Sequence, residues 1–397
     1  MNNPSMRFKR DDGTVFPDWS SSEIGNVADT CSGGTPSTSV SEYWDGPIQW
    51  LTPTEINSKY VHNSKRTITS AGIASSSAKL LPIGALLLTT RATIGACSIN
   101  NFDGDVSTNQ GFQSLICKSS LFNEYAYYAI TRDKFQKELI KHSSGSTFLE
   151  ISSKNLKKLP IPIPCLEEQQ KIASFFSTLD QKIELNERKV EALEKLKKGL
   201  MQKIFNREIR FKQENESDFP KWNNKRLGEV ACLNNGRAYK QEELLNEGKY
   251  IVLRVGNFFT NEKYYYSNME LESCKYAHKG DLLYCWSASF GPKIWGGEKV
   301  IYHYHIWKID PINIDKNYLY YYLQRDVENL EQEMNGGTMM HLTKANMELR
   351  SVEIPVIEEQ TKIASLFIHF DKKMELVLAK INSLKKLKQG FMQQMFV

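Results

Sequence analysis

The most informative absence in this sequence of 397 residues is that of any long apolar run. No stretch approaches the roughly 18–20 uninterrupted apolar residues that cross a bilayer. The amino-terminal MNNPSMRFKR has no apolar core of the kind that a signal peptide carries. The seven cysteines include no C-x-x-C pair. These absences predict a cytoplasmic protein with reduced thiols and no membrane partner.

An excess of charge of one sign is also missing, since 51 basic residues stand against 46 acidic ones, for a formal net charge of +5. This balance permits nucleic acid as a partner but does not require it. A DNA-binding protein with so small an excess must gather its positive charge on one face or share the DNA with a more basic partner. Hydrophobic residues at 41% and charged residues at 24% are typical of a globular chain, and the length predicts two or three domains.

Catalytic signatures are absent as well. The chain has no G-x-x-x-x-G-K-[ST] phosphate loop, no G-x-G-x-x-G after a strand, no H-E-x-x-H, and no Asn-Pro-Pro-aromatic tetrapeptide of the kind that amino-methyltransferases need. His303 and His305 share one face of an expected strand, but two ligands without a Cys, Asp or Glu cluster make a poor metal site. We therefore expect no metal, and a structural role for both histidines. Pro17-Asp18 resembles the start of a nuclease motif, but the matching Lys221 lacks the carboxylate, which favours a turn.

What the chain does contain is an internal repeat. Residues 167–205 and 358–396 are identical at 21 of 39 aligned positions, with a constant offset of 191. A second pair of segments, 7–19 and 210–222, begins RFK in both copies and is related by an offset of 203. Between these flanks the two halves diverge. Each half is therefore a divergent block followed by a shared segment, which indicates two versions of one domain on a common frame.

The shared segments follow a coiled-coil pattern, with apolar residues at alternating spacings of four and three. The seam consists of Ile172, Phe176, Leu179, Ile183, Val190, Leu193, Leu200 and Ile204 in the first copy, and of Ile363, Phe367, Phe370, Met374, Val377, Ile381, Leu384, Phe391 and Met395 in the second. Only Asn186, Lys197 and Lys388 interrupt it. Each copy predicts a long helix that needs a partner, and the matched register favours the other copy over separate packing on each domain.

Connectivity predicts that the two helices are antiparallel. A helix of 39 residues is about 58 Å long, and a parallel pair would force the second block to bridge that whole length. A parallel pair in register would also set Lys197 against Lys388, an unfavourable contact between like charges. An antiparallel pair returns the carboxyl end to the first domain. The predicted arrangement is therefore circular, with the two chain ends close together and approximate two-fold symmetry. We expect a circular permutation to be tolerated.

The divergent blocks carry short apolar and aromatic runs broken by Gly, Ser, Thr and Asn, and each run of strands is followed by an expected helix, at 124–143 and at 317–334. This order predicts an α+β fold. The predicted organisation is a first globular domain at 1–160, a first coiled-coil helix at 164–206, a second globular domain at 207–352 and a second coiled-coil helix at 355–397.

Loops of the divergent blocks contain Arg, Lys, Asn, Gln and Thr beside glycines, and these residue types grip phosphates and read base edges. The candidates for DNA contact are Lys65, Arg66, Arg91, Thr93, Asn109, Gln110, Arg237, Lys240, Arg254, Lys293 and His341.

Two variable domains, each followed by a P-x-x-E-E-Q-x-x-I-A-type helix that ends in K-L-K-x-G-x-M-Q-x-x-F, resemble the specificity subunit of type I restriction–modification systems. The resemblance rests on PCLEEQQKIASFF and PVIEEQTKIASLF and covers the whole chain. It implies that the blocks are target recognition domains, each reading one half of a bipartite double-stranded DNA sequence. It also implies that the helices set the half-site spacing and dock two methyltransferase subunits.

By the same resemblance this chain has no catalytic residue and no cofactor of its own. S-adenosylmethionine, ATP and Mg²⁺ belong to the methyltransferase subunits and to restriction subunits that act as translocases. Two other functions stay open on the residues alone. One is a scaffold that carries two lectin-like or peptide-binding domains on a coiled-coil spacer, and the other is a stand-alone DNA endonuclease with duplicated DNA-binding domains.

Overall fold

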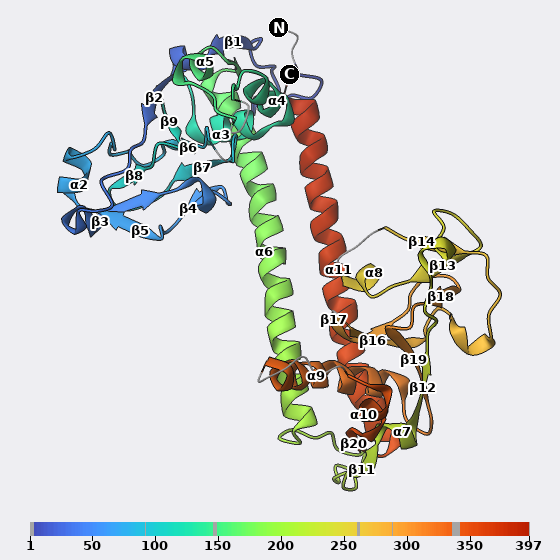
Figure 1. Cartoon of the computed structure of the whole chain (residues 1–397). Coiled ribbons are helices and arrows are strands. Elements are labelled where there is room, and N and C mark those ends of the chain that lie inside the picture. The colour runs from blue at the N-terminus through green and yellow to red at the C-terminus, as the bar shows by residue number, and fades with distance from the viewer. Residues whose placement is uncertain are drawn as a thin grey trace. The chain divides into compact units, whose positions relative to one another are not determined.

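The structure is a computed structural model that describes residues 4–91, 93–145, 149–259, 263–287, 289–335 and 342–396. It divides into two compact units (Figure 1). Unit 1 comprises Met1–Glu187 with Ala379–Val397, and unit 2 comprises Arg188–Leu378. Each unit therefore contains one globular domain and one half of each of the two long helices.

The globular domain of unit 1 is built on two sheets. The larger sheet has the strand order β2-β9-β6-β7-β4 and the smaller one β5-β3-β8, while β1 and β10 form an antiparallel pair. The strands are β1 (Ser20–Glu23), β2 (Ala28–Ser32), β3 (Trp44–Leu51), β4 (Tyr60–Val61), β5 (Arg66–Ile68), β6 (Leu86–Leu88), β7 (Cys97–Asn100), β8 (Val106–Thr108), β9 (Gln113–Cys117) and β10 (Pro160–Ile163). The helices are α1 (Ile24–Val27), α2 (Ser70–Ala74), α3 (Asn123–Thr131), α4 (Asp133–Lys141) and α5 (Ser153–Lys157), with 3₁₀ turns η1 (Ser41–Tyr43) and η2 (Pro53–Glu55).

The globular domain of unit 2 repeats this plan. Its sheets have the orders β12-β19-β16-β17 and β14-β13-β18-β15, and β11 pairs with β20 as β1 pairs with β10. The strands are β11 (Asn223–Arg226), β12 (Ala231–Asn235), β13 (Tyr250–Leu253), β14 (Tyr265–Ser267), β15 (Tyr276–Ala277), β16 (Leu282–Ser287), β17 (Ser289–Ile294), β18 (Val300–Tyr302), β19 (Ile306–Pro311) and β20 (Ser351–Ile354). The helices are α7 (Leu227–Val230), α8 (Gly256–Phe259), α9 (Lys316–Asn335) and α10 (Lys344–Leu349), with η3 (Gln241–Glu243) and η4 (Ser273–Lys275). The expected α+β class is confirmed.

The helix expected at 317–334 is present as α9, whereas the one expected at 124–143 is wrong in one respect. The chain leaves helical geometry at Arg132, where φ is −70° and ψ is 147°, so that α3 and α4 are separate. Gln136 donates from Nε2 to the carbonyl oxygens of Ile130, at 2.8 Å, and of Gly95, at 3.0 Å. The bond to Ile130 satisfies a carbonyl in the last turn of α3, which has no partner within that helix once the helix ends.

The two shared segments form the longest helices, α6 (Leu166–Phe205) and α11 (Ile357–Met395). With 40 and 39 residues, they are about 60 and 58 Å long. In unit 1, Lys388 lies 2.5 Å from Asp180. In unit 2, Lys197 lies 2.6 Å from Asp371. Within each unit, then, the early part of one helix packs against the late part of the other, and the antiparallel arrangement is confirmed.

The predicted seam residues face the packed side of these helices. Those of α6 are buried or, for Leu200, half-buried, and those of α11 are buried or half-buried as well. Both ends of the pair join a domain core. Phe396 stacks on Tyr125 and Phe176 in unit 1, and Phe205 stacks on Phe367 in unit 2. The late end of each helix thus completes the hydrophobic core of the domain beside it.

Candidate DNA-reading domains and their anchors

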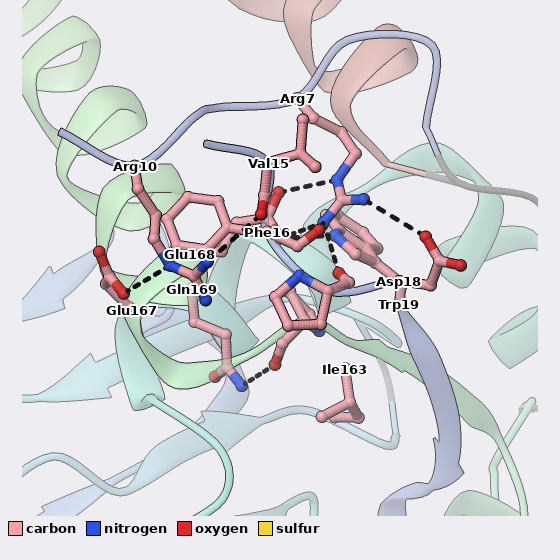
Figure 2. A network of polar contacts seen from close by, with 12 residues as sticks. Arg7, Arg10, Val15, Phe16, Asp18, Trp19, Ile163, Glu167, Glu168 and Gln169 are labelled. Atoms are coloured by element: carbon pink, nitrogen blue, oxygen red, sulfur yellow. Dashed lines mark hydrogen bonds and ion pairs between the residues drawn. The ribbon is translucent and has the colours of Figure 1, made fainter. Parts of the chain in front are cut away.

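A buried carboxylate joins the first turn of α6 to the amino-terminal segment of unit 1. Glu168 is fully buried and accepts hydrogen bonds from Arg7 Nε at 3.0 Å and Arg7 Nη2 at 2.7 Å. The indole Nε1 of Trp19 donates to the same carboxylate at 2.9 Å, and Figure 2 shows the group. The Glu168 hydrogen bond raises the pKa of Arg7 above its ordinary value. Bidentate geometry and a third donor supply the partners that a buried charge needs.

Unit 2 contains the same anchor. Glu359 is fully buried and accepts from Arg210 Nε at 3.1 Å, from Arg210 Nη2 at 2.7 Å and from Trp222 Nε1 at 3.0 Å. The two anchors are related by the offsets of the sequence repeat, 203 for the arginine and tryptophan and 191 for the glutamate. Both domains are therefore fixed to their long helix by one arrangement of side chains.

A second repeated cluster holds the two long helices and the domain together. In unit 1, Asp180 of α6 accepts from Tyr128 Oη at 2.7 Å and from Lys388 of α11. In unit 2, Asp371 of α11 accepts from Tyr321 Oη at 2.6 Å and from Lys197 of α6. Burial, with the Asp180 carboxylate second, raises the pKa of Tyr128. The lysines that interrupt the seam are thus paired.

Two of the candidate DNA-contact residues lie at the edge of the smaller sheet of unit 1. Arg66 begins β5 and is exposed, and its guanidinium lies 3.5 Å from the ring centroid of Trp44. Lys65 is exposed, and its backbone N–H donates to Glu55 at 2.7 Å. The Arg66 guanidinium therefore makes a cation–π contact with Trp44 while its side chain stays exposed.

The other four candidates in unit 1 lie in two connections. Arg91 is half exposed and pairs with Glu150 at 2.7 Å, and the exposed Thr93 donates to the Pro53 carbonyl at 3.5 Å. Asn109 and Gln110 follow β8 directly and lead into β9. The structure brings Asn109 and Gln110 together and leaves Arg91 engaged by a carboxylate of its own domain.

The candidates in unit 2 differ in how much they are committed to internal contacts. Arg237 makes a bidentate pair with Glu243, at 2.9 and 2.7 Å, which lowers the pKa of Glu243 to about 2. Lys240 is exposed. Arg254 is exposed and its guanidinium lies 5.4 Å from the Tyr265 ring centroid, while Lys293 is half-buried against Phe259, 5.0 Å from that ring centroid. His341 lies outside the described residues.

Sequence reasoning missed an aromatic surface beside Arg237. His303, Tyr304 and His305 lie between β18 and β19, and Tyr304 is 39% exposed. Trp286 packs edge-on to His305 with ring centroids 5.0 Å apart and stacks on Trp307 at 5.5 Å. The available signal is the cluster of aromatic residues in HYHIW, for which the sequence predicts a strand with two structural histidines. Among the described residues no three His, Cys, Asp or Glu side chains gather as a metal ion would require.

Two different β-rich domains, each fixed to a pair of antiparallel helices by the same buried contacts, define a duplicated protein. The chain belongs to the family described as type I restriction modification DNA specificity domain, which matches residues 17–195 and 220–386. The two matched ranges correspond to the two halves of the sequence repeat. In the described part of the chain, no helix has the length and apolar character to cross a membrane.

Named relatives agree with this assignment. The chain is 36% identical over 252 residues to the type I restriction enzyme MjaIX specificity subunit of Methanocaldococcus jannaschii, which covers 60% of this chain and 58% of the relative. It is 27% identical over 160 residues to the EcoR124I/EcoR124II specificity subunit of Escherichia coli, covering 40% of each. Each alignment spans less than two thirds of the relative's length.

The fold is also that of solved structures. The S subunit of a type I restriction–modification system from M. genitalium matches with a TM-score of 0.62 and 18% identity, over 100% of this chain and 99% of that one. A chain from a study of complex assembly and conformational transition in the type I system matches with a TM-score of 0.61 and 19% identity, over 96% and 98%. At these identities the likeness concerns the fold.

Proposed function

We propose that this chain is the non-catalytic subunit that addresses a type I restriction–modification complex to its DNA. Each globular domain reads one half of a bipartite target in double-stranded DNA. The observation that supports this most is the repetition of the anchors at Glu168 and Glu359 under domains whose loops differ. Two domains that recognise different half-sites need the same attachment to the helices and different loops.

The coiled coil, in this proposal, sets the distance between the half-sites. Two protein modules that read one face of the major groove are spaced by about 34–36 Å per helical turn of DNA. The number of unread base pairs then depends on the length of α6 and α11. Inserting one heptad into each helix should lengthen the spacer, as mapped by sequencing the methylated bases of host DNA. An active variant with an unchanged spacer would show that the length of the helices does not set the distance between the half-sites.

Adenine methylation and DNA cleavage belong, in this proposal, to partner subunits that bring S-adenosylmethionine, ATP and Mg²⁺. Two methyltransferase subunits dock on the helices, and a surface for them is suggested by four leucines that lie off the seam. Unit 1 exposes Leu185 (68%) and Leu387 (47%), and unit 2 exposes Leu376 (72%) and Leu196 (53%). The pairs 185/376 and 196/387 follow the offset of 191, so each unit offers equivalent apolar side chains for one partner.

Docking can be tested one unit at a time. Replacing Leu185 and Leu387 by lysine should reduce the complex from two methyltransferase subunits to one, measured by native mass spectrometry. Replacing Leu376 and Leu196 should do the same from the other unit. Ile83→Lys, which alters an exposed apolar residue of the unit 1 domain, is the control and should leave two subunits bound. Retention of both partners by the leucine variants would exclude this surface.

Two rival functions are separated by direct measurements. A scaffold that binds no nucleic acid would show no salt-dependent affinity for duplex DNA with or without methyltransferase subunits. A stand-alone endonuclease would cut duplex DNA when the purified chain is given Mg²⁺ alone.

Exchange of the second domain for that of a relative should change one half of the target only. A change in both halves would show that the domains do not read independently.

A further inference from the structure

One short connection occupies the same place in both domains and has different side chains in each. In unit 1 it runs from β8 in the smaller sheet to β9 in the larger sheet, through residues 109–111. Three backbone hydrogen bonds hold it: Gly34 N–H to Thr108 O at 2.8 Å, Asn109 N–H to Leu51 O at 3.0 Å, and Thr90 N–H to Gly111 O at 2.8 Å. We call this connection turn 1.

The equivalent connection in unit 2, turn 2, runs from β18 to β19 through residues 303–305. Three of its backbone hydrogen bonds are Arg237 N–H to Tyr302 O at 3.0 Å, His303 N–H to Leu253 O at 2.9 Å, and Trp286 N–H to His305 O at 3.1 Å. They match those of turn 1 one for one. The strand before each turn also pairs in parallel with the strand that ends at Leu51 or Leu253. These hydrogen bonds and this strand pairing therefore support the two turns in the same way.

A glycine completes this support in both domains. A Cβ on Gly33 would lie 2.1 Å from the carbonyl oxygen of Asn109, and a Cβ on Gly236 would lie 2.3 Å from that of His303. Neither neighbour is a flexible side-chain end, so a larger residue would displace the turn. The two glycines are related by the offset of 203 that relates the starts of the halves.

Turn 1 offers hydrogen-bond donors. The Asn109 side-chain oxygen accepts from Gly111 N–H at 2.9 Å, and the Gln110 side-chain oxygen accepts from Thr35 Oγ1 at 2.5 Å. Both amide oxygens are therefore occupied by the chain itself. Within the described residues neither NH₂ group has a hydrogen-bond partner. Gln110 is exposed and Asn109 half-buried, so the turn can present two amide donors to a ligand.

Turn 2 offers an imidazole and an aromatic face. The Nδ1 atom of His303 accepts the His305 backbone N–H at 3.4 Å. Burial, with His305 and Arg254 next, lowers the pKa of His303 to about 4, so at neutral pH its single ring hydrogen lies on Nε2 as a donor. Tyr304 lies across His305 with ring centroids 3.9 Å apart. A hollow of about 430 Å³ beside the turn is lined by Trp286 and Tyr304, among others.

We propose that turn 1 and turn 2 are the base-reading turns of the two domains, each contacting base edges of one half-site of double-stranded DNA. Turn 1 donates from Asn109 and Gln110 to base acceptors such as N7 or O6 of guanine or O4 of thymine. Turn 2 donates from His303 and packs Tyr304 against an apolar base edge such as the thymine methyl. The same support with different side chains gives each domain its own sequence. This inference rests on the proposed function.

The test uses the full chain assembled with its methyltransferase subunits, and the readout is the map of methylated adenines in host DNA. In the double variant Asn109→Ala/Gln110→Ala, one or two base positions of one half-site should become degenerate while the other half-site is unchanged. In His303→Ala/Tyr304→Ala the reverse should hold. Loss of the paired base contacts of one turn should reduce discrimination at the affected positions by about 10- to 100-fold.

Glycine variants supply a second and independent perturbation. Gly33→Ala should disturb readout of the first half-site alone, and Gly236→Ala of the second alone. The matched controls are Gly104→Ala and Gly296→Ala, because a Cβ at either position has open space around it. Both controls should retain the parental target. For any variant too weak to methylate, competition binding of the assembled complex supplies the same comparison, with duplexes altered in one half-site.

Specificity that is unchanged in both turn variants, or altered in both half-sites by a single turn, would overturn the inference while leaving the proposed function intact. A parental complex that methylates no bipartite sequence would overturn the proposed function and this inference with it.

Discussion

Replacing Glu168 by glutamine should release the amino-terminal segment of unit 1 from α6. The carboxylate is fully buried and accepts three hydrogen bonds, two of them from Arg7, whose side chain is only 16% exposed. Glutamine keeps the volume but turns an NH₂ group toward a guanidinium nitrogen. The cation then retains only the weaker contact with the exposed Asp18 carboxylate, 3.9 Å away. Removal of one partner from a buried pair costs about 3–5 kcal/mol. Because the amide oxygen can still accept from Trp19, we expect about 3 kcal/mol.

The assay is hydrogen exchange measured by mass spectrometry on the native chain, since a protein of two units need not unfold in one step. Peptides that cover β1 and β10 should lose about two decades of protection, at 1.4 kcal/mol per decade. Peptides that cover β11 and β20 in unit 2 should be unchanged. Glu359→Gln should give the opposite pattern, because its contacts are the same.

Glu167→Gln is the control. This neighbour has a side chain that is 52% exposed and lies 3.6 Å from Arg10, and exposed pairs contribute little. Equal loss of protection in the Glu167 and Glu168 variants would refute the reasoning, because it would assign the effect to charge at the helix start and not to the buried contact. Unchanged protection in Glu168→Gln would refute it as well.

Three further outcomes follow from the repeated contacts. Lys388→Met should destabilise unit 1 by about 1.5–3 kcal/mol, because it removes a charged hydrogen bond from Asp180; a double-mutant cycle with Asp180→Asn, measured by hydrogen exchange of peptides from unit 1, should show coupling above 1 kcal/mol, and additivity would contradict it. Phe396→Ala should cost about 3–5 kcal/mol as a buried aromatic, detected as lost exchange protection in the core of unit 1 and not of unit 2. A circular permutant with the original ends linked and new ends between Asn206 and Arg207 should keep its far-ultraviolet spectrum, because Met6 N–H already donates to Gln394 O at 3.1 Å; loss of the helical signal would contradict it.

The long helices could be predicted from sequence because their information is local and repeated. A seam with spacings of four and three specifies helix and partner together, and the antiparallel direction follows from the connection between Phe205 and the second domain. The strand-and-helix alternation of the blocks was enough for the α+β class. The break at Arg132 was not predictable, since no Gly or Pro marks it and the stabilising contact comes from Gly95, in a distant part of the chain.

The anchors show the limit of local reasoning more sharply. At the start of a helix, Glu168 fits the general preference for acidic residues near the positive end of the helix dipole. Its burial could not be read from that pattern, because Arg7 and Trp19 lie 161 and 149 residues earlier. Only the offsets of 191 and 203 hinted that these residues belong to one arrangement.

The sequence by itself determined that this protein has two related domains on two paired helices, because a periodic pattern and a repeated segment can be recognised from the residues alone. Only the tertiary structure decided which side chains share the two turns that we propose to contact bases. Asn109 and Gln110 could be selected by residue type, whereas His303 was assigned a structural role because its neighbours in sequence suggested nothing else. Its place beside Arg237 and Trp286 exists only after three strands from two sheets meet at one turn, and strand pairing over such distances leaves no local pattern.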